Sequence, residues 1–582
     1  MRLIPFGVAV VAAALYFVNL GEPPFIEPPE GFHVVVARGM IDSGDSITPR
    51  LDGVRYFDKP PLLYWLMSAT FSLDGITPFS ARFWPAVAAV GCAAVTAHVG
   101  VMLGGPRVGL IAGLIVAANL GMFVYGRLVK PDVPFIFCIM LAYAGFTAAY
   151  LGRHPRWGLT LLWGGLGLAA LAKDPLGALA PLLVIGLLFR LTRERPLAPW
   201  WPWWAVVLFV ALALPWYVAV EARNPGFVWY TIVDNHVLNF LHRRIFPDED
   251  VPLGNVEFLA ITVAMFLPWS LSAPSAIARA LRRPWERPAD RVLAVFALWA
   301  VLVIGFFTLS AFKLPHYGLP AIPALALVVA STWDRTIGGE PGGIEPRVLV
   351  LSMALLFAVA GVVLAAVWAG VLGIPREALT AVEMTARNMA ARGQVAVNRP
   401  LEAFRPMLAS SAVIFSVAAV VLAVAAWWRS AQLGVTVALA AMLAFLPSAA
   451  RGMAEFARGR SAGPIVEALV HRAQPGDTIV HEGPLENSAS MLLAVPPPVH
   501  VVNGSLSNLA FGATFPEAAD IFWDLARLRD RWTAAGRTFL VSVVNGERSV
   551  VRSLPPGRVH LIADANGRRL YSNVADARPG AP

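Results

Sequence analysis

About thirteen apolar stretches, separated by short polar segments, set what this chain can fold into. Most of them have the roughly 17 to 25 residues that a helix needs to cross a hydrocarbon core of about 30 Å. Only 14% of the 582 residues are charged and 57% are hydrophobic, whereas about a quarter of a globular chain is charged. We therefore expect an all-α polytopic membrane protein. The predicted spans are residues 3–20, 81–103, 107–125, 132–151, 157–172, 175–191, 199–220, 256–278, 290–310, 314–331, 347–372, 408–427 and 431–449.

Arginines gather in the polar segments between alternate apolar stretches. Short cytoplasmic loops of membrane proteins are enriched in Lys and Arg, so the net charge of +9 indicates topology and not nucleic-acid binding. With a cytoplasmic N-terminus, the arginine-rich loops lie inside the cell. Four segments then lie outside: residues 21–80, 221–255, 373–407 and everything after about residue 450.

The first outer loop, residues 21–80, contains two apolar segments that are too short to span a membrane. They cover residues 30–41 and 61–71, and we expect both to be helices lying along the membrane surface. The segment between them is rich in Gly, Pro and Asp, which is typical of a loop.

The composition changes after about residue 450, where charged residues return. Strand-like runs at residues 478–480 and 538–544 alternate with helical patterns such as residues 518–532. We therefore expect a transmembrane domain over residues 1–450 and a small soluble α/β domain over residues 451–582.

The four lysines of the chain all lie at predicted outer helix ends, while its other basic residues are arginines. They are Lys59, Lys130, Lys173 and Lys313, and each is followed within two residues by proline. Lysines that merely anchor helices at an interface are one interpretation. Arginine would anchor a helix equally well. The anchoring interpretation also does not explain why acids and tyrosines lie near these lysines.

Two carboxylates stand out at the same outer ends. Asp132 opens a predicted helix next to Lys130, and Glu30 opens the first surface helix. A carboxylate at membrane depth is costly and points to function, although a helix-dipole partner worth under about 1 kcal/mol is the simpler alternative. Acids, cations and the phenols of Tyr56 and Tyr317 together suit chemistry that stabilises a phosphate leaving group and activates an acceptor.

Several motifs together resemble a known family. The segment EGFHVVVARGMIDSGDSITPRLDGVRYFDKPPLLYWL, residues 30–66, looks like the first periplasmic loop of bacterial polyprenyl-phosphate-sugar glycosyltransferases. These GT-C membrane enzymes include the lipid A aminoarabinose transferases, in a superfamily with protein O-mannosyltransferases. RLVKPD, AKDPLG and KLPHYGLP extend the resemblance over about residues 20–330.

The resemblance implies a bacterial inner-membrane enzyme with a periplasmic active site. It would transfer a sugar, with inversion, from an undecaprenyl-phosphate-type carrier to lipid A, another envelope glycolipid or a glycan. Residue by residue, Lys59 and Tyr56 match the pattern that holds the donor phosphate, and Lys313 and Tyr317 lie in the motif that closes the same cavity. Asp132 matches the acidic residue that opens a later periplasmic segment, and Asp132 or Glu30 would be the catalytic carboxylate that organises the acceptor. We add Arg127, one turn before Asp132, to the phosphate-binding candidates.

The chain departs from the family pattern at two places. The usual Asp-Glu pair of the first loop is Pro29-Glu30 here. Either Glu30, or Glu27 one turn earlier, takes the role of base, or the protein uses a different acceptor chemistry. AKDP replaces the usual Lys-Gly-Pro, and Asp174 then weakens the case for Lys173 as a phosphate ligand.

Three alternatives stay open at this point. A divalent metal between Asp132, Glu30 and the phosphate is one, although no ligand spacing demands it. A protein O-glycosyltransferase of the same fold is another. A transporter or flippase of lipid-linked sugars is the third, and it would favour charges near the bilayer midplane and an inverted repeat.

Overall fold

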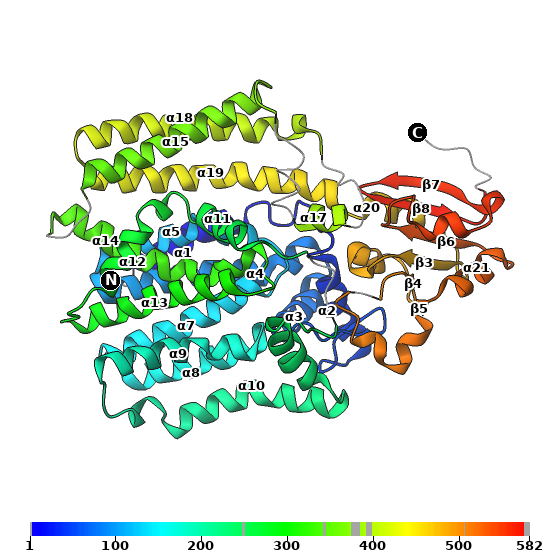
Figure 1. The fold of residues 1–582 in the computed structure, drawn as a ribbon, viewed down its shortest axis with the longest axis horizontal. Coiled ribbons are helices and arrows are strands. Elements are labelled where there is room, and N and C mark those ends of the chain that lie inside the picture. Colours follow the sequence, from blue (N-terminus) through cyan, green and yellow to red (C-terminus); the bar gives the residue numbers. More distant parts are fainter. Residues whose placement is uncertain are drawn as a thin grey trace.

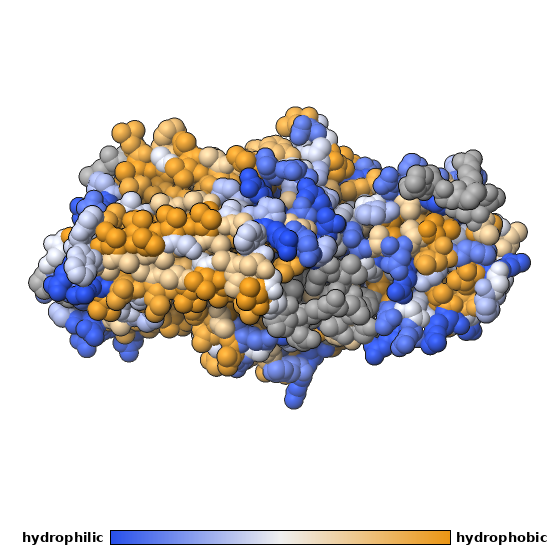
Figure 2. All heavy atoms as spheres, turned by 90° about the horizontal axis from the view of Figure 1, so that it is seen from above, coloured by the Kyte–Doolittle hydropathy of each residue, from blue (hydrophilic) through white to orange (hydrophobic). Residues whose placement is uncertain are grey.

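The computed structural model describes residues 3–246, 251–340, 345–373, 384–391, 399–505 and 507–575. The molecule is elongated, with a bundle of helices at one end and a β-sheet at the other (Figure 1). A broad apolar band covers the flank of the helical part, and a more polar belt separates this band from the sheet (Figure 2). The predicted combination of a helical membrane part and a small C-terminal sheet region is confirmed.

The helical part is built from long apolar helices that approach each other closely at glycines. A Cβ added to Gly158 on α8 would lie 2.7 Å from the carbonyl oxygen of Gly145 on α7. Small residues of this kind let helix backbones pack tightly within a membrane. The helices of this part are α1 (Leu3–Phe17), α4 (Pro78–Gly104), α5 (Pro106–Ala117), α6 (Leu120–Gly126), α7 (Asp132–Tyr150), α8 (Pro155–Ala172), α9 (Pro175–Thr192), α10 (Trp203–Arg223), α11 (Asn255–Met265), α12 (Ala273–Leu281), α13 (Pro288–Leu309), α14 (Ile322–Gly338), α15 (Pro346–Trp368), α17 (Met384–Ala391), α18 (Arg405–Trp427) and α19 (Ala431–Arg460).

The count of thirteen spans is not confirmed. Among the described residues, eight helices are long and apolar enough to cross a membrane, or nine if α5 and α6, bent by 57°, form one broken span. Asn119 is the N-cap of α6: its side chain accepts a hydrogen bond from the Met122 amide and so starts a separate helix after α5. The predicted span over residues 256–278 is likewise divided, into α11, a short 3-10 turn and α12.

Short irregular helices connect these elements. The π-helix η2 (Trp229–Leu238) follows α10, and the 3-10 helix η4 (Pro315–Ala321) leads into α14, so the span predicted over residues 314–331 begins in 3-10 geometry. The others are η1 (Ala198–Trp200), η3 (Trp269–Leu271), η5 (Leu401–Phe404), η6 (Leu485–Leu493), η7 (Gly512–Thr514), η8 (Pro516–Asp520), η9 (Val550–Ser553) and η10 (Pro556–Arg558).

The first loop folds between the helical bundle and the sheet (Figure 1). Its two predicted helices are present as α2 (Gly31–Ser43) and α3 (Leu62–Asp74). Between them, β1 (Arg50–Leu51) and β2 (Val54–Arg55) form a hairpin. Asp52 and Gly53 make its two-residue turn with φ values of 51° and 82°, the positive angles that favour an Asp-Gly turn.

The C-terminal region contains a six-stranded sheet in the order β5-β4-β3-β6-β8-β7. Strands β5, β4, β3 and β6 run parallel to one another, and β8 runs antiparallel to both of its neighbours, β6 and β7. Both predicted strands exist, whereas the helix predicted over residues 518–532 is restricted to α21, because residues 516–523 form a 3-10 turn and a short strand. The elements are α20 (Gly463–Val470), α21 (Leu525–Thr533), β3 (Thr478–Glu482), β4 (His500–Val502), β5 (Phe522–Trp523), β6 (Thr538–Ser542), β7 (His560–Ala565) and β8 (Arg568–Ser572).

The sheet region is attached to the first loop by specific hydrogen bonds. The Ser490 amide donates to Glu27 at 2.8 Å, and the Val499 amide donates to Asp52 at 2.9 Å. Arg38 on α2 donates to the Leu492 carbonyl at 2.8 Å. These contacts fix the loop that carries several candidate site residues.

Candidate active site

Polar side chains from five separate elements meet at the ends of the bundle helices that face the first loop. They come from the loop between β2 and α3, from α2, from the starts of α7 and α9, and from η4, and they are joined by Lys173 at the end of α8 and His236 on η2. This is the end at which the four lysines are predicted to lie. The structure brings Lys59, Lys130 and Lys173 together around His316, whereas Lys313 is bound within its own turn.

Asp132 is the centre of this cluster. It is the first residue of α7, where the helix dipole favours a negative charge. Its Oδ1 lies 2.5 Å from the Lys173 ammonium and 3.5 Å from Nε2 of His316. In the part of the chain that the structure describes, Oδ2 receives no hydrogen bond. A buried carboxylate thus keeps one oxygen for an outside partner.

Lys173 reaches Asp132 from the end of α8 and lies 5.0 Å from the ring centre of Tyr317. The neighbouring Asp174 does not compete for it, because this acid caps α9 through the amides of Leu176 and Gly177. Lys173 is therefore engaged by Asp132, and not by the adjacent acid that the sequence pointed to.

Asp174 has a second partner, Nε2 of His236 at 2.9 Å. Burial alone would lower the pKa of His236, but the hydrogen bond and charge of Asp174 outweigh it and raise the pKa above its ordinary value. Asp174 is thus engaged by His236 on η2 as well as by its own helix, and Lys173 contacts Asp132 instead.

Lys59 and Tyr56 lie on the loop that precedes α3. The Lys59 ammonium is 2.6 Å from Oδ2 of Asp58, and the Tyr56 hydroxyl is 3.5 Å from the same oxygen. Burial would raise the pKa of Asp58, but Lys59 and then Arg244 overcome that effect and hold the pKa below its usual range. Asp58 is therefore an anion that holds Lys59 in place.

Two histidines connect these groups electrostatically. Burial, reinforced by Lys130 and Lys59, lowers the pKa of His33 to about 3, so its ring is neutral; its Nδ1 lies 2.8 Å from the Tyr64 hydroxyl. His316 interacts electrostatically with Asp132 and with three of the lysines, Lys130, Lys173 and Lys59. Three lysines here face two carboxylates, Asp132 and Asp58, and this excess of cations suits a region that attracts a phosphate.

The other predicted site residues are engaged within the protein. Both oxygens of the buried Glu30 accept hydrogen bonds, from Arg82 at 2.7 and 2.8 Å and from the Ile26 and Val129 amides at 2.9 and 3.0 Å. Arg127 donates to three carbonyls at the end of α1, and Lys313 donates to Asn255 and to the Thr308 and Ser310 carbonyls near the end of α13.

Sequence reasoning did not single out Arg82 or His316, and it placed Lys173 below the other lysines. Arg82 carries a signal that could have found it, since it is a charged residue inside an otherwise apolar helix and needs a buried partner. The meeting of Lys173 with Asp132 has no local signal, because 41 residues separate them.

No group of three or more His, Cys, Asp or Glu suited to a metal occurs within the described ranges. The arrangement proposed from sequence would use Glu30 as a ligand. Its two oxygens already accept four hydrogen bonds, so it does not fit that role and we derive no step through a metal.

The sequence of the chain is similar to those of transferases that use lipid-linked sugars. The family model "Dolichyl-phosphate-mannose-protein mannosyltransferase" matches residues 38–231. The chain is 28% identical over 329 residues to an undecaprenyl phosphate-alpha-4-amino-4-deoxy-L-arabinose arabinosyl transferase of Serratia proteamaculans, and 29% identical over 343 residues to one of Pseudomonas aeruginosa. Each match covers 56% of this chain and 58% of the relative, so the chain spans little more than half the length of these curated relatives.

The fold as a whole matches a solved membrane enzyme. ArnT from Cupriavidus metallidurans, in a crystal structure bound to undecaprenyl phosphate, superposes with a TM-score of 0.77 over 98% of both chains at 23% identity. The chain therefore has the GT-C fold of membrane glycosyltransferases, as the sequence resemblance predicted. Within that class, its helices and its C-terminal sheet follow the arrangement seen in ArnT.

Proposed function

We propose that this protein is a glycosyltransferase that takes a sugar from a polyprenyl-phosphate carrier. The observation that carries the proposal is Asp132, a buried carboxylate with one oxygen held by Lys173 and the other available, in a region that Lys59 and Lys130 make positive. The carrier leaves as a phosphate, and cations fixed in a partly dry site stabilise that charge as it develops. The relatives' names and the ligand of the ArnT crystal support undecaprenyl phosphate as the carrier.

In this mechanism the bond between the sugar and the carrier phosphate breaks while an acceptor oxygen bonds to the sugar. Lys59 and Lys173 receive the phosphate, and each is already positioned by a carboxylate, Asp58 or Asp132. Asp132 positions the acceptor through its second oxygen and takes the proton where the acceptor is a hydroxyl. Tyr317, against Lys173, closes the same region.

Glu30, Arg127 and Lys313 act as positioning residues in this proposal. Glu30 fixes the backbone at Val129, three residues before Asp132. Arg127 binds the same loop to the end of α1. Lys313, three residues before His316, fixes the turn that leads into η4. Their loss would displace the site without removing a group that touches the substrate.

The site and the C-terminal sheet would face the periplasm of a bacterial inner membrane. The arginine-rich loops at the opposite helix ends support that orientation. The acceptor is proposed to be lipid A or another envelope glycolipid, in line with the arabinosyl transferase relatives. The match to a protein mannosyltransferase family over residues 38–231 favours a protein acceptor as the second candidate.

A transfer assay tests the proposal with purified protein in liposomes. Undecaprenyl phosphate-alpha-4-amino-4-deoxy-L-arabinose, the donor named in the relatives, would be labelled and offered with lipid A or with an envelope protein extract. We expect label on lipid A, and about a 100-fold slower transfer with Asp132→Asn or Lys59→Ala. Label on protein alone would move the assignment to the second acceptor.

A matched control is Asp334→Asn, since Asp334 also pairs with a cation, Arg107 at 3.1 Å, but lies at the C-terminal end of α14, away from the site. It should transfer at the wild-type rate. If Asp132→Asn and Lys59→Ala also transferred the sugar at the wild-type rate, the mechanism would be refuted.

A further inference from the structure

A cavity of about 510 Å³ lies at the far end of the helices from the candidate active site. It is formed where α9 ends, between α8 and the 3-10 helix η1 that precedes α10. Since α9 begins beside Asp132 and Lys173, the apolar wall of the cavity starts roughly 10 Å along this helix, at Leu182, and its arginine rim starts roughly 22 Å along it, at Arg190. The cavity therefore belongs to a different site.

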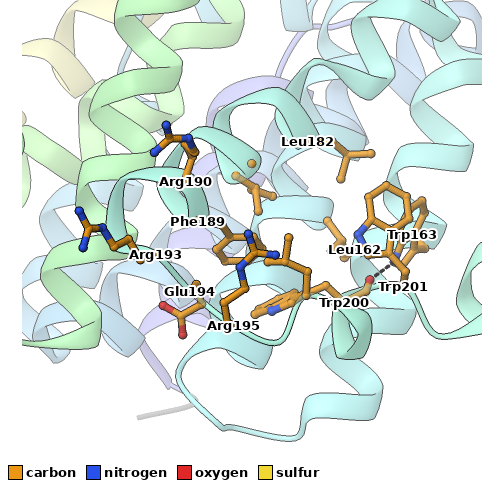
Figure 3. Close-up of a pocket in the computed structure, with 13 residues that line it drawn as sticks. Leu162, Trp163, Leu182, Phe189, Arg190, Arg193, Glu194, Arg195, Trp200 and Trp201 are labelled. Atoms are coloured by element: carbon orange, nitrogen blue, oxygen red, sulfur yellow. Dashed lines mark hydrogen bonds between the residues drawn. The ribbon is translucent and has the colours of Figure 1, made fainter.

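The cavity has an apolar side and a cationic side (Figure 3). Leu162, Leu182, Trp163 and Trp201 lie at one side of the view, and Arg190, Arg193 and Glu194 lie at the other (Figure 3). Trp163 is held in place by a hydrogen bond from its Nε1 to the Trp200 carbonyl at 3.0 Å. The apolar wall is thus built on one buried and anchored ring, Trp163, against which the more exposed Trp201 packs edge-on at 4.8 Å between ring centres.

The arginines at the rim are not neutralised by the protein. No ion pair or side-chain hydrogen bond joins Arg190, Arg193 or Arg195 to another group in the described part of the chain. The single acid of the lining, Glu194, is engaged elsewhere, 3.6 Å from Arg291 and 3.3 Å from the Tyr150 hydroxyl. Three exposed guanidinium groups therefore lack an anion.

The surroundings of the cavity are apolar and face outward. Leu183 on α9 is 75% exposed, and Val207 and Val210 on α10 are also exposed. In a membrane-spanning bundle, side chains of this kind face lipid. A ligand at this place would therefore meet hydrocarbon on one side and guanidinium groups on the other.

We propose that this cavity binds an anionic phospholipid, with its phosphate on the arginine rim and part of an acyl chain against the tryptophan wall. Arginine recognises phosphate through paired N–H donors, and basic pockets between membrane helices suit anionic lipid headgroups. The volume lies within the usual range of about 300 to 1,000 Å³ for ligand pockets. The site is independent of the proposed transfer reaction and stands if that reaction is refuted.

One position allows the apolar part to be tested separately from the arginines. Gly186 lines the cavity, and a Cβ added there meets no atom within 4 Å. Gly186→Leu would fill the apolar space, leave the arginines in place and raise helix propensity. Gly305 on α13 is equally open but lies away from the cavity, so Gly305→Leu is the matched control.

The experiment measures lipid binding to the purified full chain in detergent by native mass spectrometry. The probes are phosphatidylglycerol, phosphatidylcholine with the same acyl chains, and inorganic phosphate. We expect phosphatidylglycerol to bind about tenfold more tightly than phosphatidylcholine. This preference should disappear in the triple variant Arg190→Gln, Arg193→Gln, Arg195→Gln, and binding should weaken about tenfold in Gly186→Leu.

The charge-matched control is the triple variant Arg153→Gln, Arg156→Gln, Arg282→Gln, which removes three exposed arginines outside the cavity. It should bind phosphatidylglycerol like the wild type. Equal binding of the two lipids to the wild type would overturn the proposal. Inorganic phosphate binding that Gly186→Leu leaves unchanged, without a preference for phosphatidylglycerol, would also overturn it, because that result describes an anion site without an acyl-chain pocket.

Discussion

Glu30 and Asp132 are both buried carboxylates paired with a cation, yet their surroundings differ in a way that separates structure from chemistry. Glu30 is fully buried, and Arg82 and two backbone amides saturate its two oxygens. Asp132 is held through Oδ1 alone, by Lys173 and His316. A saturated carboxylate holds segments together, whereas a half-satisfied one can still bind a substrate.

The cations of the two pairs differ as well. Arg82 uses its three guanidinium nitrogens on Glu30 and on the carbonyls of Leu20, Pro23 and Pro24, so it is fixed from several directions. Lys173 makes one short contact with Asp132 and lies over the Tyr317 ring, with 22% of its side chain exposed. A lysine held by one contact and partly exposed can also reach a phosphate placed beside Asp132, because an ammonium has three donors.

The largest expected effect is on stability, at the Glu30–Arg82 pair. Arg82→Met should lower the free energy of unfolding by about 3 to 5 kcal/mol, because it leaves a buried carboxylate without its charge partner. Thermal unfolding in detergent measures this loss. The double variant Glu30→Gln, Arg82→Met should regain part of it, because no lone charge then stays buried. A single variant as stable as the wild type would contradict the structural role.

The second effect is on turnover, at Asp132. Asp132→Asn should slow sugar transfer about 100-fold or more while shifting the unfolding temperature far less than Arg82→Met does. The shape of the residue is kept and one oxygen is already without a protein donor. Activity and unfolding temperature measured on the same preparations separate the two carboxylates. A loss of stability matching that of Arg82→Met would place Asp132 with Glu30.

The sequence predicts elements whose cause is local and misses contacts whose cause is not. Residues 30–41 and 61–71 are predictable as short helices, since their apolar runs are bounded by Pro and Gly. Asp132 is predictable as a buried acid at a helix start. That Glu30 would meet Arg82, 52 residues away, depends on how α4 packs on the first loop, and no local pattern contains that information.

The same limit explains the lysines. Their common place at helix ends follows from proline spacing, but which lysines share a site depends on the packing of distant helices. Lys313 donates hydrogen bonds to the carbonyls of its own turn. Lys173 contacts Asp132, although the adjacent Asp174 made it the weaker candidate in the sequence. Asp174 contacts its own helix and His236, an arrangement that the order of residues along the chain does not indicate.

A third buried carboxylate, Asp52, extends the comparison to pH. It accepts one hydrogen bond, from the Val499 amide, and its Oδ1 has no partner in the described part of the chain. Burial raises the pKa of Asp52 from 3.8 to about 6, and the Val499 bond opposes that rise. The protonated acid is therefore favoured in the folded state, so its contribution to stability is complete below about pH 3.8 and is lost as pH rises through about 6.

Asp52→Asn should remove that loss, because an asparagine amide stays neutral and still accepts the Val499 hydrogen bond. Asparagine also tolerates the φ of 51° at this turn. We expect the variant to be more stable than the wild type by about 1 to 2 kcal/mol at pH 7.5 and nearly equal to it at pH 4. Thermal unfolding at both pH values measures the difference. A gain of the same size at pH 4 would assign it to something other than ionisation.

The smallest expected effect is at Asp174, the acid next to Lys173. Asp174→Asn should change the free energy of unfolding by only about 0.5 kcal/mol, because asparagine caps a helix as well as aspartate does and the contact with His236 that it weakens is partly exposed. Asp174→Ala should cost about 1 kcal/mol, since the amides of Leu176 and Gly177 lose their acceptor. Transfer activity should stay within about twofold of the wild type in the asparagine variant, because Lys173 keeps Asp132 as its partner. A fall in activity close to that of Asp132→Asn would mean that the charge of Asp174 controls Lys173 after all, and that the two acids work as a pair.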